Sequence, residues 1–360
     1  NGVLTGSYFS YVDNVEVVDE KTVVVHMSSW DALFDYGLAR TCFICSPTAV
    51  EELGPDGFNE TPVGTGPFKV TKWVHGEGIY TEAYADYWQG KPYLDSVNFK
   101  IYASTATQQA AMEVGDLDIM YLTGDAVTAD SMEASGYTIT NSSIPDSGHT
   151  LCFNSKADGP LTDVRVRQAI AYAIDVPTLV DSVGGSALTV ANSILPVSDW
   201  AYADLGSYSY DPDKSRELLA DYGKPVSFTM VINNSGYQPD IAEALQGYLS
   251  EVGIDMQIET YEFATFISKL INCEIAATIN SNSGGSDPSD SFTPYERNSG
   301  NACAEFRDEE LLTLLEQAKN EADVETRKGM YKEIQQIVHD NFYFIPLYTG
   351  RTVYAVRNGI

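Results

Sequence analysis

The stretch from Leu151 to Gly185 constrains the fold more than any other part of the sequence. It opens with a short apolar run, Leu151 to Phe153, breaks at polar, glycine and proline residues, and continues into two expected helices. Asp163 stands at an N-cap position, where its carboxylate can accept hydrogen bonds from the unpaired amides of the first turn. Asp175-Val176-Pro177 ends the first helix and begins the second, because proline is tolerated in a first turn but not in a helix interior. The stretch predicts a strand, a loop and two packed helices, which is a fold pattern and not a catalytic one.

The first of these helices has one apolar side. Val164, Ile170-Ala171 and Ile174 fall near the 3.6-residue period of a helix that buries one face. On this spacing Arg165, Arg167 and Gln168 are expected to point away from that face.

Length and charge limit the possible functions. A chain of 360 residues, at roughly 150 residues per domain, predicts at least two domains. The charge balance of 21 basic against 51 acidic residues gives a formal net charge of −30. Such a surface repels phosphate backbones and anionic lipid headgroups, which argues against nucleic-acid binding. No run approaches the ~20 apolar residues needed to span a bilayer.

The remaining elements follow from local patterns. The N-terminal half predicts a hairpin at 15–27, short helices near 31–38 and 48–53, strands at 68–74, 78–83 and 96–102, a helix at 105–114, and a strand at 118–121 that could join the same sheet. The C-terminal half predicts helices at 211–223, 239–252, 262–270, 308–322 and 324–339, and strands at 226–232, 254–260, 274–279, 342–348 and 352–356. This alternation is typical of helices layered on a sheet.

The five cysteines do not form a recognisable metal or redox site. Cys42-x-x-Cys45 lacks a second such pair, and the four histidines lack ligand spacing, so ordinary buried thiols and no metal are expected. Cys273 and Cys303 could pair in an oxidising compartment, although sequence leaves the connectivity open.

Sequence motifs for catalysis are absent. The chain contains no G-x-x-x-x-G-K-[ST], H-E-x-x-H or G-x-S-x-G, and no G-x-G-x-x-G between a strand and a helix. Gly64 to Pro67 looks like a phosphate-binding turn, but a strand and not a helix follows it. No catalytic residue and no cofactor are therefore assigned, and an enzyme is not expected.

The loop from Asn280 to Pro294 is the main candidate for binding. It follows an apolar strand and is rich in small polar groups and amides, with two acids. Long loops at strand ends are where binding groups concentrate, although a solvated surface loop is the alternative.

Three segments together resemble one family. Gly64 to Tyr102, Phe153 to Asp175 and Tyr210 to Gly223 resemble the peptide/nickel class of solute-binding proteins of ABC importers, the family-5 extracytoplasmic receptors. The resemblance runs in order from about Val15 to Tyr348 and so covers nearly the whole chain.

The resemblance implies an α/β, two-lobed, class II periplasmic-binding-protein-like fold, with mixed sheets, flanking helices and a cleft between the lobes. Residues 1–60 resemble the C-terminal part of an accessory domain, residues 61–149 with 346–360 resemble lobe I, and residues 150–345 resemble lobe II. Family members carry further residues, including a signal peptide and a lipid-anchored cysteine, before the point where this sequence starts. The resemblance thus implies an N-terminally truncated chain.

The implied function is that of the extracytoplasmic binding component of an ABC importer. Such a monomer captures a small solute, oligopeptide-class or related, by lobe closure around two strands near 149–153 and 344–348, and delivers it to the permease. The expected location is the periplasm, or the outer face of the cell membrane through a lipid anchor. The expected ligand contacts are polar side chains of the loop, two apolar walls and two residues at the hinge: Asn280, Asn282, Ser283, Asp287, Phe292, Tyr295, Phe153 and Asn154.

One departure from the family bears on the ligand. Peptide-binding members place an aspartate four residues before the proline of the loop's Asp-Pro, where it pairs with the ligand's α-amino group. Such a charge-assisted contact is worth roughly 1.5–3 kcal/mol. Counting back from Pro288 gives Gly284, whereas Asp287 is adjacent to the proline. This difference argues against a free-amino peptide and keeps oligosaccharides, nickel chelates and other solutes open.

Two other classes of function remain as alternatives. A hydrolase of peptides or glycans would need a nucleophile or an acid pair in one cleft, and a non-transport surface receptor would lack a permease.

Overall fold

The computed structural model describes most of the chain in two compact units. The described residues are 9, 11–102, 104–122, 126–141, 147–154, 159–184, 188–234, 236–282, 287–292, 295, 308–350 and 353–360. The first unit comprises residues 1–34 and 121–360, and the second comprises residues 35–120.

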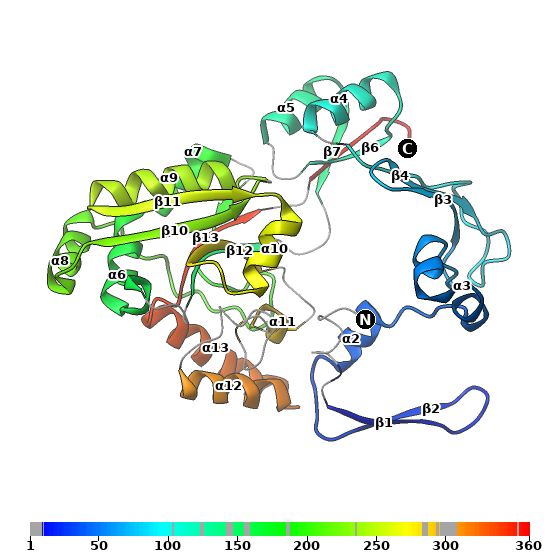
Figure 1. Cartoon of the computed structure of the whole chain (residues 1–360), viewed down its shortest axis with the longest axis horizontal. Helices are drawn as coiled ribbons and strands as arrows, with labels where there is room; N and C mark the ends of the chain where they lie inside the picture. Colours follow the sequence, from blue (N-terminus) through cyan, green and yellow to red (C-terminus); the bar gives the residue numbers. More distant parts are fainter. Residues whose placement is uncertain are drawn as a thin grey trace. The chain divides into compact units, whose positions relative to one another are not determined.

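A six-stranded mixed sheet organises the first unit, with the strand order β11-β10-β12-β8-β13-β9 (Figure 1). The strands are β8 (Ser147–Phe153), β9 (Leu188–Val190), β10 (Val226–Asn233), β11 (Ile254–Tyr261), β12 (Ala277–Asn282) and β13 (Phe344–Gly350). Strand β10 is parallel to β11 and β12, whereas β8 is antiparallel to β12 and β13. The C-terminal ends of β10, β11, β12 and β13 therefore meet the N-terminal end of β8 at one edge, called here the carboxyl edge.

Helices cover both faces of this sheet. Alternation along each strand sends neighbouring side chains to opposite faces, so Leu151 lies in one core and Cys152 in the other. The first face packs against α6 (Val164–Ala173), α7 (Val176–Gly184) and α9 (Gln238–Glu251), and α8 (Pro212–Tyr222) packs on α6. The second face packs against α10 (Phe263–Ile271), α11 (Pro288–Phe292), α12 (Glu309–Asn320) and α13 (Val324–Asp340). The prediction of a mixed α/β fold with flanking helices is confirmed.

The start of α6 follows the sequence prediction. After the short 3-10 helix η1 (Pro160–Thr162), the Asp163 carboxylate accepts a hydrogen bond from the Arg165 amide at 2.9 Å. Two positions differ from the expectation: Val164, expected on the buried face, is 38% exposed, and Arg167, expected to point away from that face, is buried. Its guanidinium donates to four backbone carbonyl groups, including those of Leu161 at 3.1 Å and Asn341 at 3.0 Å. Those acceptors make burial of the charge possible.

Two smaller sheets complete the first unit. Strands β1 (Val12–Val17) and β2 (Val23–Met27) form the predicted hairpin. Strands β6 (Ile119–Leu122), β14 (Val353–Val356) and β7 (Thr138–Asn141) form a sheet in the order β6-β14-β7, on which α5 (Ala126–Ala134) packs. The expected strand at 118–121 thus joins the chain's C-terminal strand and not the sheet of residues 68–102. Its true partner is more than 200 residues away, so no local pattern could indicate it.

The second unit contains a three-stranded antiparallel sheet and helices. Its elements are α2 (Phe34–Thr41), α3 (Pro47–Glu60), β3 (Phe68–Val74), β4 (Gly78–Ala83), β5 (Phe99–Lys100) and α4 (Thr105–Val114), with the sheet order β3-β4-β5. The expected strand at 96–102 is only two residues long. Before it, side-chain bonds replace the ladder: the Thr81 hydroxyl donates to the Val97 carbonyl at 2.6 Å, and the Thr81 amide donates to the Asn98 side chain at 3.1 Å.

The expectation of buried thiols at Cys42 and Cys45 was wrong. Both cysteines are free and exposed, in the segment between α2 and α3. Phe43 beside them is 77% exposed, and α3 contains no buried residue, so within the described residues no apolar layer covers this segment.

Candidate functional site

The carboxyl edge of the six-stranded sheet is the candidate functional site. In open α/β sheets ligands bind outside the carboxyl ends of the strands, where the backbone leaves the sheet and loops can surround a solute. The loop identified from the sequence starts at this edge, because β12 ends at Asn282. Strand β12 lies beside β8, and Asn280 is opposite Thr150.

The side chains of Asn280 and Tyr295 are hydrogen-bonded to each other. Alternation directs Asn280 to the second face of the sheet, where its Nδ2 donates to the Tyr295 hydroxyl at 2.8 Å. Tyr295 is fully buried, and its hydroxyl lies 3.5 Å from the Cys152 sulfur. The Tyr295 ring also packs against Phe344, with 4.4 Å between ring centroids. This tyrosine therefore connects the base of the loop to the centre of the sheet.

Asp287 forms a buried ion pair on the same side. Arg327 of α13 donates to both carboxylate oxygens, from Nη1 at 2.8 Å and from Nη2 at 2.7 Å. The Ser289 amide adds a third hydrogen bond at 3.0 Å. Asp287 is 8% exposed and Arg327 is 5% exposed, so water screens the pair little. The contact fixes the first turn of α11 to α13.

The other predicted contacts are divided between the core and the end of β12. Phe292 is fully buried and stacks on Tyr331 at 5.9 Å. Phe153 lies in the core of the first face, and the Asn154 amide group donates to the Ile275 carbonyl at 2.8 Å.

The remaining loop positions are less fully described. Asn282 is the last residue of β12 and lies opposite Gly148, whereas Ser283 and Gly284 fall outside the described residues. The structure thus brings Asn280, Asp287, Phe292 and Tyr295 onto the second face. Whether any of the eight predicted residues touches a ligand stays a prediction.

His149 is a polar residue at this edge that the sequence reasoning did not select as a contact. Strand register places Ser281 of β12, His149 of β8 and Tyr348 of β13 in one row across three adjacent strands. The His149 ring stacks on the Tyr348 ring, with centroids 4.3 Å apart and planes 10° from parallel. Among the described residues, its buried Nδ1 has no hydrogen-bond partner. Burial lowers the pKa of His149 to about 4, so the ring is neutral at pH 7.

No short-range signal identifies this row. Ser281 and Tyr348 are far from His149 in the sequence, and only the sheet brings them together.

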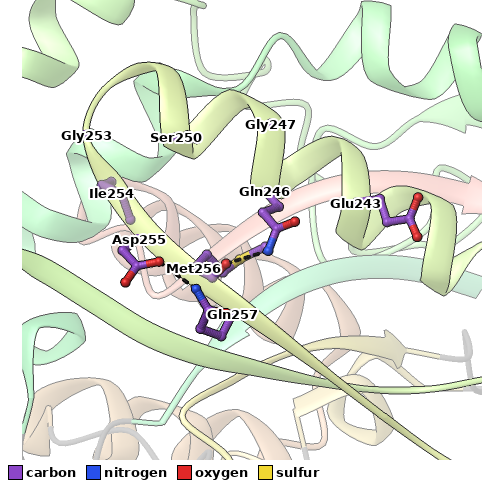
Figure 2. A pocket seen from close by; sticks show the side chains of 9 residues that line it. All are labelled: Glu243, Gln246, Gly247, Ser250, Gly253, Ile254, Asp255, Met256 and Gln257. Carbon is purple, nitrogen blue, oxygen red and sulfur yellow. Dashed lines mark hydrogen bonds between the residues drawn. The ribbon is translucent and has the colours of Figure 1, made fainter.

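A cavity at the other edge of the sheet is less suited to a specific ligand. Figure 2 shows it between the end of α9 and the start of β11. Its volume is about 640 Å³. Its side chains already bond within the wall: Gln246 donates to the Met256 carbonyl at 2.7 Å, and Gln257 donates to the Asp255 carboxylate at 2.6 Å. The cavity is an open depression beside an edge strand, and it is remote from the candidate loop.

The described part of the chain offers neither a cluster of metal ligands nor a helix able to cross a membrane. Within it, no group of three or more histidine, cysteine, aspartate or glutamate residues is placed to hold a metal ion. None of its helices has both the length and the apolar sequence that crossing a bilayer requires.

A family model, described as bacterial extracellular solute-binding proteins, family 5 Middle, matches residues 3–302. The chain belongs to this family. Among curated members, it is 29% identical to the heme-binding protein A of Haemophilus influenzae over 93% of this chain, and 24% identical to the dipeptide-binding protein of Escherichia coli over 91%. The chain spans 64% of the length of each of these relatives.

Solved structures show the family-5 fold. The DppA protein of Helicobacter pylori, solved with the peptide STSA, matches 98% of this chain with a TM-score of 0.87 and 23% identity. The NikZ protein of Campylobacter jejuni, solved with Ni(L-His), matches 98% with a TM-score of 0.85 and 21% identity. This chain covers 72% and 74% of those two chains. The prediction of a family-5 solute-binding fold is therefore confirmed.

Proposed function

We propose that this chain is the substrate-binding part of an ABC importer that captures a small solute by lobe closure and delivers it to a permease. The observation that carries the proposal is the family-5 match over residues 3–302. The carboxyl edge of the six-stranded sheet supports it, because the candidate loop and the Ser281–His149–Tyr348 row meet there. The protein binds and releases its solute without chemical change.

The division into lobes is part of this proposal. Lobe II comprises residues 150–345, lobe I comprises residues 61–149 with 346–360, and residues 1–60 belong to an accessory domain. Strands β8 and β13 are the hinge, which is supported by their adjacent antiparallel pairing in the sheet. The location is extracytoplasmic, in the periplasm or held at the membrane by a lipid anchor.

The ligand is proposed to be an oligopeptide-class or related solute without a free α-amino group. Asn280, Asn282 and Ser283 supply polar contacts from the loop, which rests on Asp287, Phe292 and Tyr295. Glycine at position 284 supplies no carboxylate for an ammonium group. Oligosaccharides and nickel chelates are the alternative solutes.

A panel of solutes tests this function by the thermal unfolding of the purified protein. The panel contains Ala-Ala, N-acetyl-Ala-Ala, cellobiose, Ni(II) with L-histidine, and hemin. A ligand at a hundred times its Kd stabilises the folded state by about 2.7 kcal/mol, which raises Tm by roughly 3–4 °C in a protein of this size.

At least one solute is expected to raise Tm and to be recovered intact by mass spectrometry. N-acetyl-Ala-Ala is expected to bind better than Ala-Ala. No shift with any solute would contradict the proposal, and recovery of cleaved peptide or sugar would favour a hydrolase instead.

A further inference from the structure

We infer that His149, supported by Tyr348 and flanked by Ser281, is a ligand-contact residue that donates a hydrogen bond to an uncharged acceptor oxygen of the solute. The inference rests on the proposed solute-binding function and names a contact for it. It concerns a different strand and a different face of the sheet from the loop residues Asn280 and Tyr295.

The His149 ring lies in a row with Tyr348 and Ser281 across three adjacent strands. His149 lies near the N-terminal end of β8, at the carboxyl edge of the sheet. Its neighbour on β13, Tyr348, is 2% exposed, whereas its neighbour on β12, Ser281, is exposed. Directly opposed residues of antiparallel strands have Cβ atoms about 4.5–5.5 Å apart, so the three side chains form a continuous surface. The row is therefore buried at its Tyr348 end and exposed to solvent at its Ser281 end.

Aromatic neighbours hold the His149 ring in place. The Tyr348 ring holds one side of the imidazole in a near-parallel stack. Tyr237, which precedes α9, packs edge-on against Tyr348 at 6.4 Å and 84°. Contact groups held by packed aromatic rings lose little conformational entropy when a ligand binds.

The contacts of the His149 ring indicate which of its nitrogens carries the hydrogen. The buried Nδ1 of His149 has no hydrogen-bond partner among the described residues, and a buried N–H without an acceptor is rarer in proteins than a buried acceptor without a donor. The neutral ring therefore carries its hydrogen on Nε2. His149 is only partly buried, and of its two ring nitrogens only Nδ1 is a buried atom without a partner among the described residues. We therefore take Nε2 as the nitrogen that can reach a ligand. Nε2 then offers a donor, and the Ser281 hydroxyl offers a second one beside it.

The two donors, His149 Nε2 and the Ser281 hydroxyl, indicate which chemical group of a ligand they suit. Both donors are uncharged, and the ring stays neutral at pH 7. An amide carbonyl or a hydroxyl oxygen suits such a pair, because a carboxylate would gain more from a cationic partner. The row thus matches the uncharged, backbone-like part of a solute.

The test uses isothermal titration with the solute of the panel that raises Tm most. His149→Phe keeps the aromatic stack and removes the donor, and is expected to raise Kd about tenfold, which is the loss of one hydrogen bond of ordinary strength. His149→Gln restores an N–H donor and is expected to bring Kd back to within about threefold of the wild type.

His339→Phe is the matched control. His339 stacks on Tyr208 at 4.7 Å and 16°, so this variant changes the same kind of pair, but Tyr208 contacts the Phe344 end of β13, which is the opposite edge of the sheet. Its Kd is expected to stay within about twofold of the wild type.

The outcomes separate this inference from the proposed function. Wild-type binding with an unchanged Kd in His149→Phe would overturn the inference and leave the function intact. Failure of the wild type to bind any solute would contradict both. As a ligand-free readout, ¹⁵N NMR at pH 7 is expected to show His149 neutral with its hydrogen on Nε2, and a hydrogen on Nδ1 would also overturn the inference.

Discussion

At the scale of single residues, the buried Asp287–Arg327 pair explains how the candidate loop is held. Asp287 stands in a loop rich in polar groups, and sequence alone marks it as a ligand contact. In the structure both of its oxygens accept from Arg327, which donates from its Nε to the Ala318 carbonyl as well. The Arg327 guanidinium also lies 5.4 Å from the centroid of the Trp200 ring. Each charge is thus balanced inside the protein, and neither can be removed alone without leaving the other buried and unpaired.

Replacement of Arg327 by methionine is therefore expected to lower the free energy of unfolding by about 3–5 kcal/mol, because Asp287 then loses its counter-charge in a buried setting. Urea denaturation measures this change. Lys214→Met is the control, since Lys214 pairs with Glu217 at 2.9 Å on an exposed helix surface and should cost no more than about 0.5 kcal/mol. Equal costs for the two variants would show that the Asp287–Arg327 pair does not hold the fold.

His149 is expected to make stability depend on pH. Burial lowers its pKa from 6.5 to about 4 in the folded protein, so between these values the unfolded chain binds more protons. The stabilisation by the neutral ring is complete above pH 6.5 and is lost as pH falls through 4, by roughly 3 kcal/mol at most.

The measurement for His149 is the difference in the free energy of unfolding between wild type and His149→Phe at pH 7, 6, 5 and 4. The wild type should lose more stability than the variant as pH falls. A constant difference would mean that the folded pKa of His149 is not lowered.

At the scale of elements, helix ends show what short-range patterns can predict. Helix α8 begins at Pro212, after the N-cap Asp211, and ends before Gly223, as expected, because the Asp211 side chain accepts from the Lys214 amide and Gly223 adopts a left-handed conformation with φ 74°. Strands β3 and β4 also match their predicted ranges. These features depend on residues within one or two turns of each other, so the sequence contains the whole cause.

Elements that depend on distant partners were missed. Helix α5 and strands β7 and β9 were not predicted, and β7 is paired with β14, whose residues lie more than 200 positions later. The candidate site follows the same rule. The loop after β12 could be predicted from its composition, whereas the Arg327 partner of Asp287 and the Tyr348 partner of His149 come from other parts of the chain.

Asp163→Ala is expected to destabilise the protein by about 1 kcal/mol, because the start of α6 loses its N-cap. The measurement is the free energy of unfolding of Asp163→Ala and of a control variant, obtained by chemical denaturation. Asp221→Ala is the matched control, since Asp221 also bonds Arg165, at 3.1 Å, but caps no amide of α6 and is exposed. If Asp221→Ala lowers the free energy of unfolding as much as Asp163→Ala does, the loss of the N-cap does not explain the effect.

At the scale of the whole molecule, the chain combines a family-5 fold with a match that covers 64% of the heme-binding protein A and of the dipeptide-binding protein. The six-stranded sheet, its helices on both faces and its carboxyl edge lie within the first unit. The candidate residues on both faces of that edge therefore belong to one compact body and can be tested in this chain.

The cysteines give a test of the whole fold. Cys42 and Cys45 are exposed and free, Cys152 is buried with a raised pKa because of that burial, and Cys273 is disulfide-bonded. N-ethylmaleimide is expected to label Cys42 and Cys45 in the native protein and Cys152 after unfolding, whereas Cys273 is expected to react only after reduction. Cys303, which the sequence offers as a partner of Cys273, lies outside the described residues. Mass spectrometry counts the labels. Rapid labelling of Cys152 in the native state would contradict the described core.

The most direct test of the solute-binding account is native mass spectrometry of the protein purified from its own cells, followed by unfolding to release what is bound. We predict one small solute per chain, held without a covalent bond and recovered chemically intact, with a lower bound fraction in His149→Phe than in His339→Phe. A protein that carries no solute and takes up none from the panel, or one that releases a cleaved product, would contradict the account.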